Sequence, residues 1–455
     1  MTGVTAAVIG VDLGTTSSKA LVRDLNGRHI ALVEDRTPWT AAEGDRTHTT
    51  ADALLRLTTG LLRRAVTEAE RDVDRLRVLA LGIAGLAESG VLIDASDSPC
   101  APIIAWFDRR GTQQVARLDR SAPEIGQQFP GRTGLPWDCQ ASIAKLMWLV
   151  DDGIELSERH RWASVPEWLV HELGGELVRE PSLASRTGLI DQGSGEVWAE
   201  GVAAAGLPAT LLPPALQGGR AAGVLRHPDL PFALQGAHLT VAGHDHPVAA
   251  IGVGAVGPDE LFNSTGTADV LARSLPGPLT ADQRQRLVEA GLSAGAHVLP
   301  GTTLVLGGVR GGLLLRRVLG MLGATEAGPR EALDAAALAC AGLPPGLEVS
   351  GAGTTGDDVV LRLRDDASPA AVWAAATRYT GAETQRVLGS IERVVGPHRS
   401  AVACGGWTRM NSVRAAKRSA IAHLTFSSVT EPGVVGAALL AEQAADVHQP
   451  LPTAL

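Results

Sequence analysis

The first hydrophobic segment of the chain predicts a buried strand that ends in a polar turn. Residues 7–11 are apolar and rich in β-branched side chains, as is typical of a buried strand. Asp12 follows, then a turn with hydroxyl side chains at residues 15–18, and then a second apolar segment at residues 20–22, which together predict a hairpin. A plain hairpin needs neither a carboxylate nor a row of hydroxyls, whereas a phosphate chain with its Mg²⁺ uses both. The alternative is a Thr- and Ser-rich turn without a ligand.

Further along the chain, the spacing of apolar residues predicts alternating strands and helices. Helical spacing runs over residues 50–71, and a buried strand at residues 78–83 leads into a loop of small residues that carries Glu88. Residues 174–236 are rich in Gly, Pro and Ala and indicate a peripheral, loop-rich region. Further strands are predicted at residues 29–33, 91–93, 103–105, 239–242 and 401–403. Further helices are predicted from residue 141, near Pro166, from Pro247, and at residues 281–290, 312–322, 330–341, 370–391, 411–422 and 434–445.

A second hairpin repeats the first one in the middle of the chain. Residues 260–271 form an apolar strand, a Gly-Thr turn with neighbouring hydroxyls, and another apolar strand. We place a domain boundary just before this hairpin, with one domain at residues 1–243 and the other at residues 244–455. Two related lobes, each opening with a phosphate-binding hairpin, would hold one nucleotide in the cleft between them. A chance match between two short turns is the alternative.

Length and composition narrow the class of protein. A chain of 455 residues exceeds a single ordinary core, and 45% hydrophobic with 20% charged residues is typical of globular proteins. The net charge is −9 and we find no basic cluster, so we expect no nucleic-acid partner. The four cysteines have neither zinc-ligand nor redox-pair spacing, which favours reduced thiols in a cytoplasmic protein. We expect no signal peptide and no membrane span.

Asp245 is the first candidate for catalysis. It lies between His244 and His246 at a predicted strand-to-helix junction. It could serve only as a helix N-cap, or it could act as a general base that takes the proton of an attacking hydroxyl. The two histidines also raise the possibility of a zinc site. We disfavour zinc because neighbouring strand residues point to opposite faces and no further ligand cluster is present.

Two other groups of residues have side chains suited to small ligands. Glu88, Trp106 and Arg109 would offer a carboxylate, an apolar plate and a cation to a polyhydroxylated ring or chain, although each alone is compatible with an ordinary surface or core position. Gly405 and Gly406 follow a strand and would let the backbone approach a flat ligand, unless they only form a tight turn.

Two nucleotide-binding motifs of other folds are excluded or disfavoured. The sequence contains no GxxxxGK[ST], so the chain is not a P-loop protein. A GxGxxG occurs at residues 252–257, but it falls late in a predicted helix instead of in the turn that opens one. We therefore interpret these glycines as a place of close helix packing. The competing hypothesis, an oxidoreductase, would require nicotinamide binding.

Taken together, these motifs resemble those of the FGGY carbohydrate kinases, within the actin/hexokinase-like ATPase superfamily. The resemblance covers essentially the whole chain, and the motifs occur in the order found in that family. The matching segments are residues 12–19 for the first phosphate motif, 106–110 for the W-x-D-x-R segment, 243–245 for the catalytic aspartate, 264–267 for the second phosphate motif, 404–406 for the adenosine motif and 431–441 for the final helix.

The resemblance implies an α/β fold of two RNase H-like, actin-like ATPase domains with a cleft between them. It implies transfer of the γ-phosphate of MgATP to a hydroxyl of a small sugar or polyol, with Asp245 as the base and Asp12 holding Mg²⁺ through water. The residues implied for ATP binding are Asp12, Gly14, Thr15, Thr16, Ser17, Lys19, Gly266, Thr267, Gly405, Gly406 and Asn411. Those implied for the acceptor are Glu88, Trp106, Arg109, Gln140 and His246.

Three departures from the family pattern leave the nucleotide preference and the acceptor open. Trp407 stands where the adenosine motif usually has a third glycine. Ala87-Glu88 matches neither the Met-His of xylulose kinases nor, in full, the Arg-Glu of glycerol kinases, and His246 replaces an Asn or Gln. The acceptor is thus a pentulose- or hexulose-like sugar or, alternatively, a glycerol- or erythritol-type polyol. A non-enzymatic actin-like or chaperone-like ATPase switch is the competing class, and a homodimer is possible.

Overall fold

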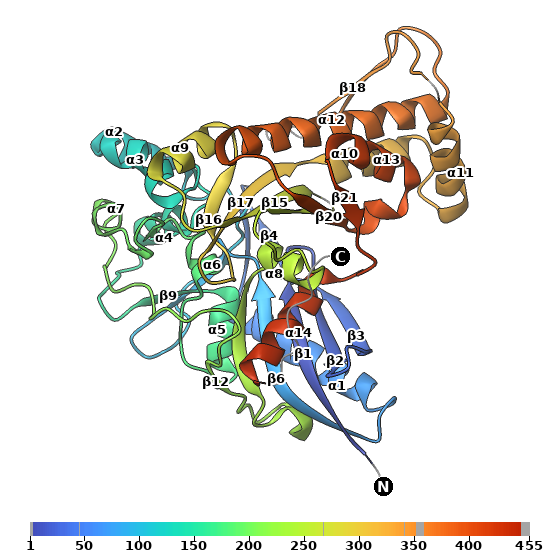
Figure 1. Cartoon of the computed structure of the whole chain (residues 1–455). Coiled ribbons are helices and arrows are strands. Elements are labelled where there is room, and N and C mark those ends of the chain that lie inside the picture. The colour runs from blue at the N-terminus through green and yellow to red at the C-terminus, as the bar shows by residue number, and fades with distance from the viewer. Residues whose placement is uncertain (1–2, 45, 267, 341, 352–358, 447–455) are drawn as a thin grey trace.

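The computed structural model describes residues 3–44, 46–266, 268–340, 342–351 and 359–446. Within these ranges two six-stranded sheets form the framework of the molecule (Figure 1). The first sheet has the order β12 (Gly223–Val224), β13 (His238–His244), β6 (Arg75–Gly85), β1 (Val4–Leu13), β2 (Ser17–Asp24), β3 (His29–Arg36). The second has the order β16 (Ser293–Ala296), β17 (Thr302–Val309), β15 (Asp269–Pro276), β14 (Glu260–Thr265), β20 (Ser400–Cys404), β21 (Leu424–Phe426).

Five strands of each sheet share one topology, and the sixth strand, β12 or β16, lies at a different end. In the first, β1 runs antiparallel to β2 and parallel to β6, which is parallel to β13. In the second, β14 runs antiparallel to β15 and parallel to β20, which is parallel to β21. The third antiparallel strand is β3 in one sheet and β17 in the other. The repetition predicted from the two hairpins is therefore confirmed over five strands of each sheet, and the fold class is the predicted two-lobed α/β type.

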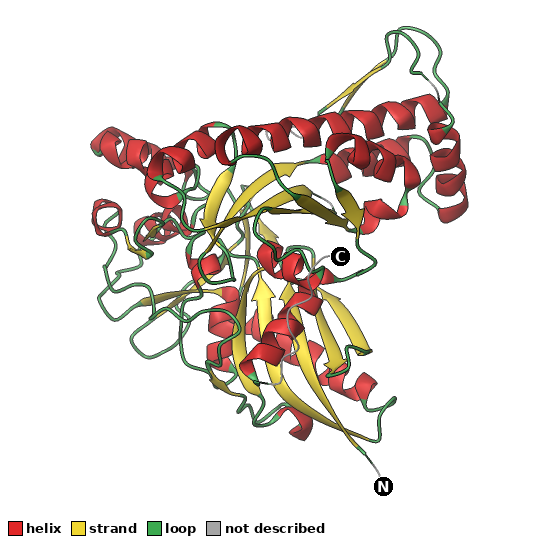
Figure 2. Cartoon of the chain, in the orientation of Figure 1, coloured by secondary structure: helices red, strands yellow, loops and turns green. Residues whose placement is uncertain are grey.

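Helices cover the sheets and connect their strands (Figure 2). The long helix α12 lies along the second sheet on the side away from the first. The helices are α1 (Ala51–Ala69), α2 (Thr112–Ser121), α3 (Pro123–Thr133), α4 (Ser142–Asp151), α5 (Val165–Glu172), α6 (Pro181–Ala184), α7 (Ala199–Ala204), α8 (Asp245–Gly252), α9 (Ala281–Glu289), α10 (Gly311–Met321), α11 (Ala327–Leu338), α12 (Pro369–Val395), α13 (Asn411–Ala420) and α14 (Pro432–Ala444), with 3₁₀ turns at Phe232–Leu234 and Gly406–Arg409. None of the helices in the described ranges is long and apolar enough to cross a lipid bilayer.

Small sheets complete the peripheral parts. They consist of β4 (Thr40–Ala42), β5 (Arg46–Thr49) and β8 (Ile103–Ile104); β7 (Gly90–Ile93) and β9 (Arg161–Ser164); β10 (Ile190–Asp191) and β11 (Glu196–Val197); and β18 (Glu348–Ser350) and β19 (Val360–Arg362). Residues 174–236 contain only short elements in the structure, as predicted. The sequence analysis missed α2 and α3; α2 has only three apolar residues among ten, which makes its hydrophobic stripe short.

Two helices lie between the sheets and bring them together. α8 packs its Ala250 against Phe262 of the second sheet, while α14 packs on β1 and β6 of the first. A Cβ added to Gly252 of α8 would lie 2.0 Å from the carbonyl oxygen of Pro432, and one added to Gly10 of β1 would lie 2.0 Å from that of Val434. The interpretation of Gly252 as a close-packing residue is confirmed. The division of the chain at residues 243 and 244 stays a prediction, because α14 lies on the first sheet although it ends the described chain.

Candidate functional site

The candidate site forms where three parallel strands of the first sheet end together. Asp12 lies opposite Ala84 in the pairing of β1 with β6, and His244 lies opposite Gly85 in the pairing of β13 with β6. The carboxyl ends of parallel strands share one edge of a sheet, where α/β proteins commonly bind ligands. Asp12, the loop that carries Glu88, and Asp245 are therefore brought to the same edge.

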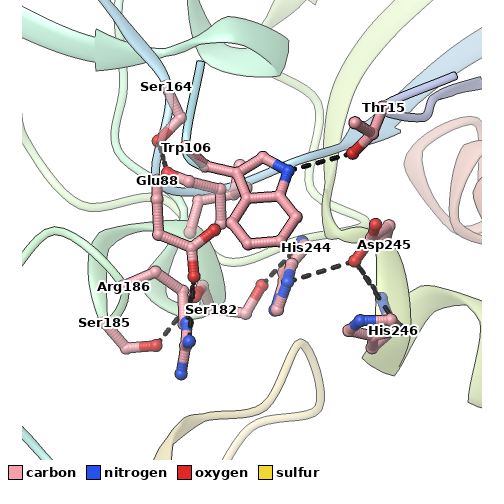
Figure 3. Close-up of polar contacts among 12 residues, drawn as sticks. Thr15, Glu88, Trp106, Ser164, Ser182, Ser185, Arg186, His244, Asp245 and His246 are labelled. Carbon is pink, nitrogen blue, oxygen red and sulfur yellow. Dashed lines mark hydrogen bonds and ion pairs between the residues drawn. The ribbon is translucent and has the colours of Figure 1, made fainter. Parts of the chain in front are cut away.

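Asp245 is the first residue of α8 and has a histidine on each side. Its Oδ1 lies 3.1 Å from Nε2 of His244 and accepts a hydrogen bond of 2.6 Å from the backbone N–H of His246 (Figure 3). The His246 Nδ1 lies 3.9 Å from the same oxygen. Burial by itself raises the pKa of Asp245, but the charges of His246 and His244 and their hydrogen bonds hold it well below its usual range. The carboxyl group is thus ionised at neutral pH.

The expectation that Asp245 points to the face opposite its neighbouring histidines is wrong. The strand ends at His244 and the helix starts at Asp245, so the alternation of side chains along a strand does not extend to Asp245, and its carboxylate lies 3.1 Å from Nε2 of His244. The two imidazole rings have their centroids 5.4 Å apart. One donor atom from each of the three residues lies within 4.8 Å of the others. The close spacing of His244 and Asp245 is explained by their hydrogen bond without an ion.

A buried carboxyl group fixes the end of β13. The backbone N–H of His244 donates to Oγ of Ser182 at 3.0 Å, and this hydroxyl donates to Oε2 of Glu180. Glu180 also accepts from the backbone N–H groups of Ser182 and Leu183, at 2.9 and 3.1 Å. Burial raises the pKa of Glu180 to about 7. The short helix α6 is therefore tied directly to the residue before Asp245.

Glu88 and Trp106 lie in the same region of the molecule as Asp245 (Figure 3). The carboxylate of Glu88 pairs with Arg186, whose Nε and Nη2 lie 2.9 and 2.8 Å from Oε1. The indole N–H of Trp106 donates to Oγ1 of Thr15 at 3.0 Å. Trp106, which is predicted to contact the acceptor, is thus held against the predicted phosphate turn.

Two residues predicted for the acceptor have exposed side chains. Arg109 is exposed, and its guanidinium makes no ion pair with any residue that the structure describes. It lines a separate cavity of about 370 Å³ together with Arg46 and Trp148. Gln140 is exposed, and its backbone N–H donates to Oδ1 of Asp138 at 2.8 Å. Acceptor contacts of Arg109 and Gln140 stay predictions.

One carboxylate oxygen of Asp12, Oδ1, is buried without a hydrogen-bond donor among the described residues. Burial and then the charge of Asp245 raise the pKa of Asp12 to about 7. A Cβ added to Gly433 would lie 2.1 Å from Oδ2, so the backbone at the start of α14 reaches this carboxylate. Lys19 does not neutralise it by a direct contact, since its Nζ lies 2.5 Å from Oε2 of Glu431.

The first turn presents backbone N–H groups. The Thr37 hydroxyl donates to the carbonyl of Gly14 at 2.6 Å, and the Trp39 indole donates to that of Thr15 at 2.8 Å. The backbone N–H of Thr37 donates to the carbonyl of Thr16 at 3.2 Å. Gly14 N–H donates to the carbonyl of Ser17 at 3.2 Å and closes the turn. In the described part of the chain the N–H groups of Thr15 and Thr16 have no acceptor. A turn with its carbonyls occupied and its amides free suits an anion.

The second turn lies against the predicted adenosine motif. Thr265 Oγ1 donates to the carbonyl of Cys404 at 2.7 Å, and the N–H of Gly266 donates to that of Ala268 at 3.0 Å. Gly405 has φ +114°, and a Cβ there would lie 2.5 Å from the Thr265 carbonyl oxygen. Only glycine fits this approach. Thr267 lies outside the described residues.

A cavity of about 290 Å³ opens beside Gly405 and Gly406 and is bounded on one side by Phe426. Trp407 does not line this cavity. Its ring lies beside that of Trp373, with the two centroids 6.3 Å apart. Asn411 is exposed at the start of α13, where its backbone N–H donates to Oδ2 of Asp334 at 2.7 Å. The two glycines thus adjoin a space for a ligand, and Asn411 lies next to this region without lining it.

The sequence analysis missed Arg186. This residue lies in the loop-rich region, where no periodicity points to a function, and it reaches Glu88 across 98 positions of sequence. Its Nη1 also donates to Oγ of Ser293 at 2.9 Å. The one available signal was a single cation in a stretch of small and apolar residues, ASRTGL.

Comparisons with known proteins give the family. The model of the FGGY family of carbohydrate kinases, N-terminal domain, matches residues 7–252. A glycerol kinase from Rhizorhabdus wittichii is 28% identical over 286 residues, which are 59% of this chain and 53% of that relative. The chain thus spans about half the length of the curated relatives it matches.

Solved structures give the fold over the whole length. A xylulose kinase from Rhodospirillum rubrum superimposes with a TM-score of 0.79 at 22% identity, covering 97% of this chain and 91% of the other. A Plasmodium falciparum glycerol kinase with ADP superimposes with a TM-score of 0.85 at 15% identity, covering 99% and 91%. With the family model matching more than half of its residues, the chain belongs to the FGGY family of carbohydrate kinases.

Proposed function

We propose that this chain transfers the γ-phosphate of ATP to a hydroxyl of a small sugar or polyol. The observation that carries the proposal is the meeting of three carboxylates, from Asp12, Glu88 and Asp245, beside a turn with free amide groups. A sugar hydroxyl is a poor nucleophile, and a carboxylate in reach of its proton assists its attack on phosphorus. Family membership and the ADP-bound glycerol kinase with the same fold support this reading.

Asp245 is the general base of the proposed reaction. Its ionised carboxylate accepts the proton of the acceptor hydroxyl while that oxygen forms a bond to the γ-phosphorus and the bond to ADP breaks. Hydrogen bonds from His244 and His246 orient the carboxylate. Two sheets joined through α8 and α14 are suited to a closing motion that excludes water and favours transfer to the acceptor over hydrolysis.

The residues around Asp12 fit the magnesium ion of MgATP. A carboxyl group with a buried, unpaired oxygen and a pKa raised to about 7 gains from a nearby cation. When bound, the ion neutralises charge on the phosphate oxygens. We propose that Asp12 holds it through water. The amides of Thr15 and Thr16, with Gly14, Ser17, Lys19, Gly266 and Thr267, would bind the phosphates.

The proposal is tested by measuring ADP release with a panel of ketoses, polyols and aldonates. ATP consumption that depends on the added acceptor supports a kinase. Consumption that no acceptor stimulates favours the competing class, an actin-like or chaperone-like ATPase switch. The panel also decides between a ketose and a glycerol- or erythritol-type polyol. A cytoplasmic location and a homodimer stay predictions.

Replacing Glu88 with alanine is expected to raise the KM of the acceptor far more than the KM of ATP. Without the carboxylate, acceptor hydroxyls lose a hydrogen-bond acceptor, and Arg186 is left half-buried without its counter-charge. We expect an increase of about ten- to a hundredfold in acceptor KM, as for loss of a hydrogen bond to a charged group. Steady-state kinetics with each substrate varied in turn give the two constants. An unchanged acceptor constant would remove Glu88 from the pocket.

Replacing His246 with glutamine is expected to move the acid limb of the pH profile of kcat/KM to higher pH. The charge of His246 lowers the pKa of Asp245, so its removal raises that pKa. A base works only when ionised, and activity then falls at a higher pH than in the wild type. His160→Gln, a substitution distant from the site, serves as the control. An acid limb that stays in place would show that His246 does not act on Asp245.

A further inference from the structure

Arg186 contacts residues from both halves of the molecule. Two of its nitrogens bind Oε1 of Glu88, in the loop after β6 of the first sheet. The third, Nη1, donates to Oγ of Ser293 in β16 of the second sheet at 2.9 Å. The side chains of Arg186 and Glu88 are both 14% exposed, so solvent screens their interaction only in part.

The pairing leaves one oxygen of Glu88 free. Both contacts from Arg186 end on Oε1, and no hydrogen bond from the described residues reaches Oε2. The pair of Arg110 with Asp108 is different: Nε binds Oδ1 at 3.0 Å and Nη2 binds Oδ2 at 2.8 Å, which occupies both oxygens. A bidentate pair of that kind is the usual arrangement. The one-sided pair at Glu88 keeps an acceptor available for ligand hydroxyls.

Arg186 is mounted on the same short segment that fixes the catalytic strand. Ser182, four residues earlier, accepts from the N–H of His244. The position of Arg186 is therefore tied to that of Asp245. On its other side, a Cβ added to Gly295 of β16 would lie 2.4 Å from Oγ of Ser185, so β16 packs closely on this segment. Residues 182–186 thus contact Glu88, the residue before Asp245, and β16.

The charges around Arg186 disfavour an anionic acceptor. Glu88 and Asp245 are carboxylates of the site, and Asp138 lies close enough for the charges of Arg186 and Glu88 to act on it. Two cations stand against these three carboxyl groups. The charge of Arg186 is already matched by Glu88, and the charge of Lys145 acts on Asp138. An acceptor that brings its own carboxylate would meet like charges here.

We propose that Arg186 is a specificity-determining positioning residue, which aims Oε2 of Glu88 at an uncharged polyhydroxylated acceptor. The neutralisation of Arg186 by Glu88, together with the other carboxylates of the site, selects against aldonates. The proposal rests on the proposed kinase function. Arg186 acts through Glu88, and its contact with Ser293 holds the guanidinium in the orientation that leaves Oε2 free.

The test compares glycerol, xylulose and gluconate as acceptors for the wild type and for variants. For Arg186→Met we expect kcat/KM of the preferred uncharged acceptor to fall by about a hundredfold, as for a displaced positioning group, with the KM of ATP within about twofold. Arg186→Lys keeps the charge but loses the fork of donors, and Ser293→Ala removes one hydrogen bond; both should cause smaller falls in the same direction. Arg132→Lys, at a pair with Asp191 outside the site, should change neither constant.

The Glu88→Gln variant tests the charge argument by a quantity that a purely structural role of Arg186 would not change, the preference between acceptors. It leaves the charge of Arg186 unmatched, so the ratio of gluconate to uncharged-acceptor kcat/KM should rise by about tenfold or more. An unchanged ratio overturns the charge argument. An unchanged acceptor kcat/KM in Arg186→Met, or an equal rise of both KM values, overturns the positioning role. If Arg186→Met does not fold, as judged by circular dichroism, the Lys and Ser293→Ala variants decide.

A failure of the proposed kinase function can be distinguished from a failure of the role proposed for Arg186. If the wild type transfers phosphate to none of the three acceptors, the proposed kinase function fails for these compounds. Calorimetric measurement of their binding then tests whether Arg186 positions Glu88. Weaker binding of an uncharged acceptor to Arg186→Met supports the inference. Equal binding to both proteins, or binding of none of the compounds, overturns it.

Discussion

Replacing Asp245 with asparagine should lower the turnover number by about a thousandfold, within the range that a general base contributes, while ATP binding stays near that of the wild type. An amide has almost the size of a carboxylate and can still accept the hydrogen bond from the N–H of His246, so the start of α8 should keep its structure. It cannot take the proton of an attacking hydroxyl. Coupled measurement of ADP release and calorimetric titration with a non-hydrolysable ATP analogue check the two parts.

A matched control for this variant is Asp151→Asn. Asp151 is a carboxylate at the end of α4, paired with Arg117 at 2.6 Å and distant from the site. We expect its loss to leave turnover unchanged. Near-normal turnover in Asp245→Asn would refute the assignment of the base. Loss of ATP binding together with turnover would point instead to a damaged fold.

Replacing Gly436 with alanine should destabilise the folded state by at least about 1–3 kcal/mol, the usual cost of overpacking a core. The added Cβ would lie 1.9 Å from the carbonyl oxygen of Val248 in α8. Neither helix can retreat, because α14 packs on β1 and β6 and α8 packs on the second sheet. The fall in melting temperature, followed by circular dichroism, measures the effect.

Gly60→Ala is the control for the glycine substitution. Gly60 lies within α1, and nothing comes within 4 Å of a Cβ added there. The same change should stabilise the fold by about 0.4–1 kcal/mol, since alanine restricts the unfolded chain more than glycine does. If Gly436→Ala melted at the temperature of the wild type, α8 and α14 would not be packed as closely as the structure has them.

Local patterns in the sequence predicted much of the framework. The apolar run at residues 7–11 indicates a buried strand, and this strand is present as β1. The apolar stripe over residues 50–71 indicates a helix with one buried face, and this helix is present as α1. Carboxylates placed directly after strands were enough to bring Asp12 and Asp245 to one edge, because parallel strands end together. The repeated strand, Gly-Thr turn and strand anticipated the shared topology of the two sheets.

Other features depended on contacts between distant parts of the chain. The contact of Asp245 with His244 was not predicted, because the alternation of side chains along a strand does not extend past the end of the strand at His244. Arg109 and Gln140 are exposed, and the contacts predicted for them with the acceptor stay predictions. The position of a residue in the sequence does not fix the direction in which a loop side chain points.

The sequence by itself determined many of the strands and helices, their order, and the residue types at the strand ends, because these follow from local periodicity and turn chemistry. Only the tertiary structure decided that α14 returns to the first sheet, that Gly436 meets Val248, and that Arg186 joins Glu88 to Ser293. Periodicity records that a residue is buried or exposed. It carries no information about which distant segment covers that residue, and the partners are chosen only when the two sheets pack around their shared helices.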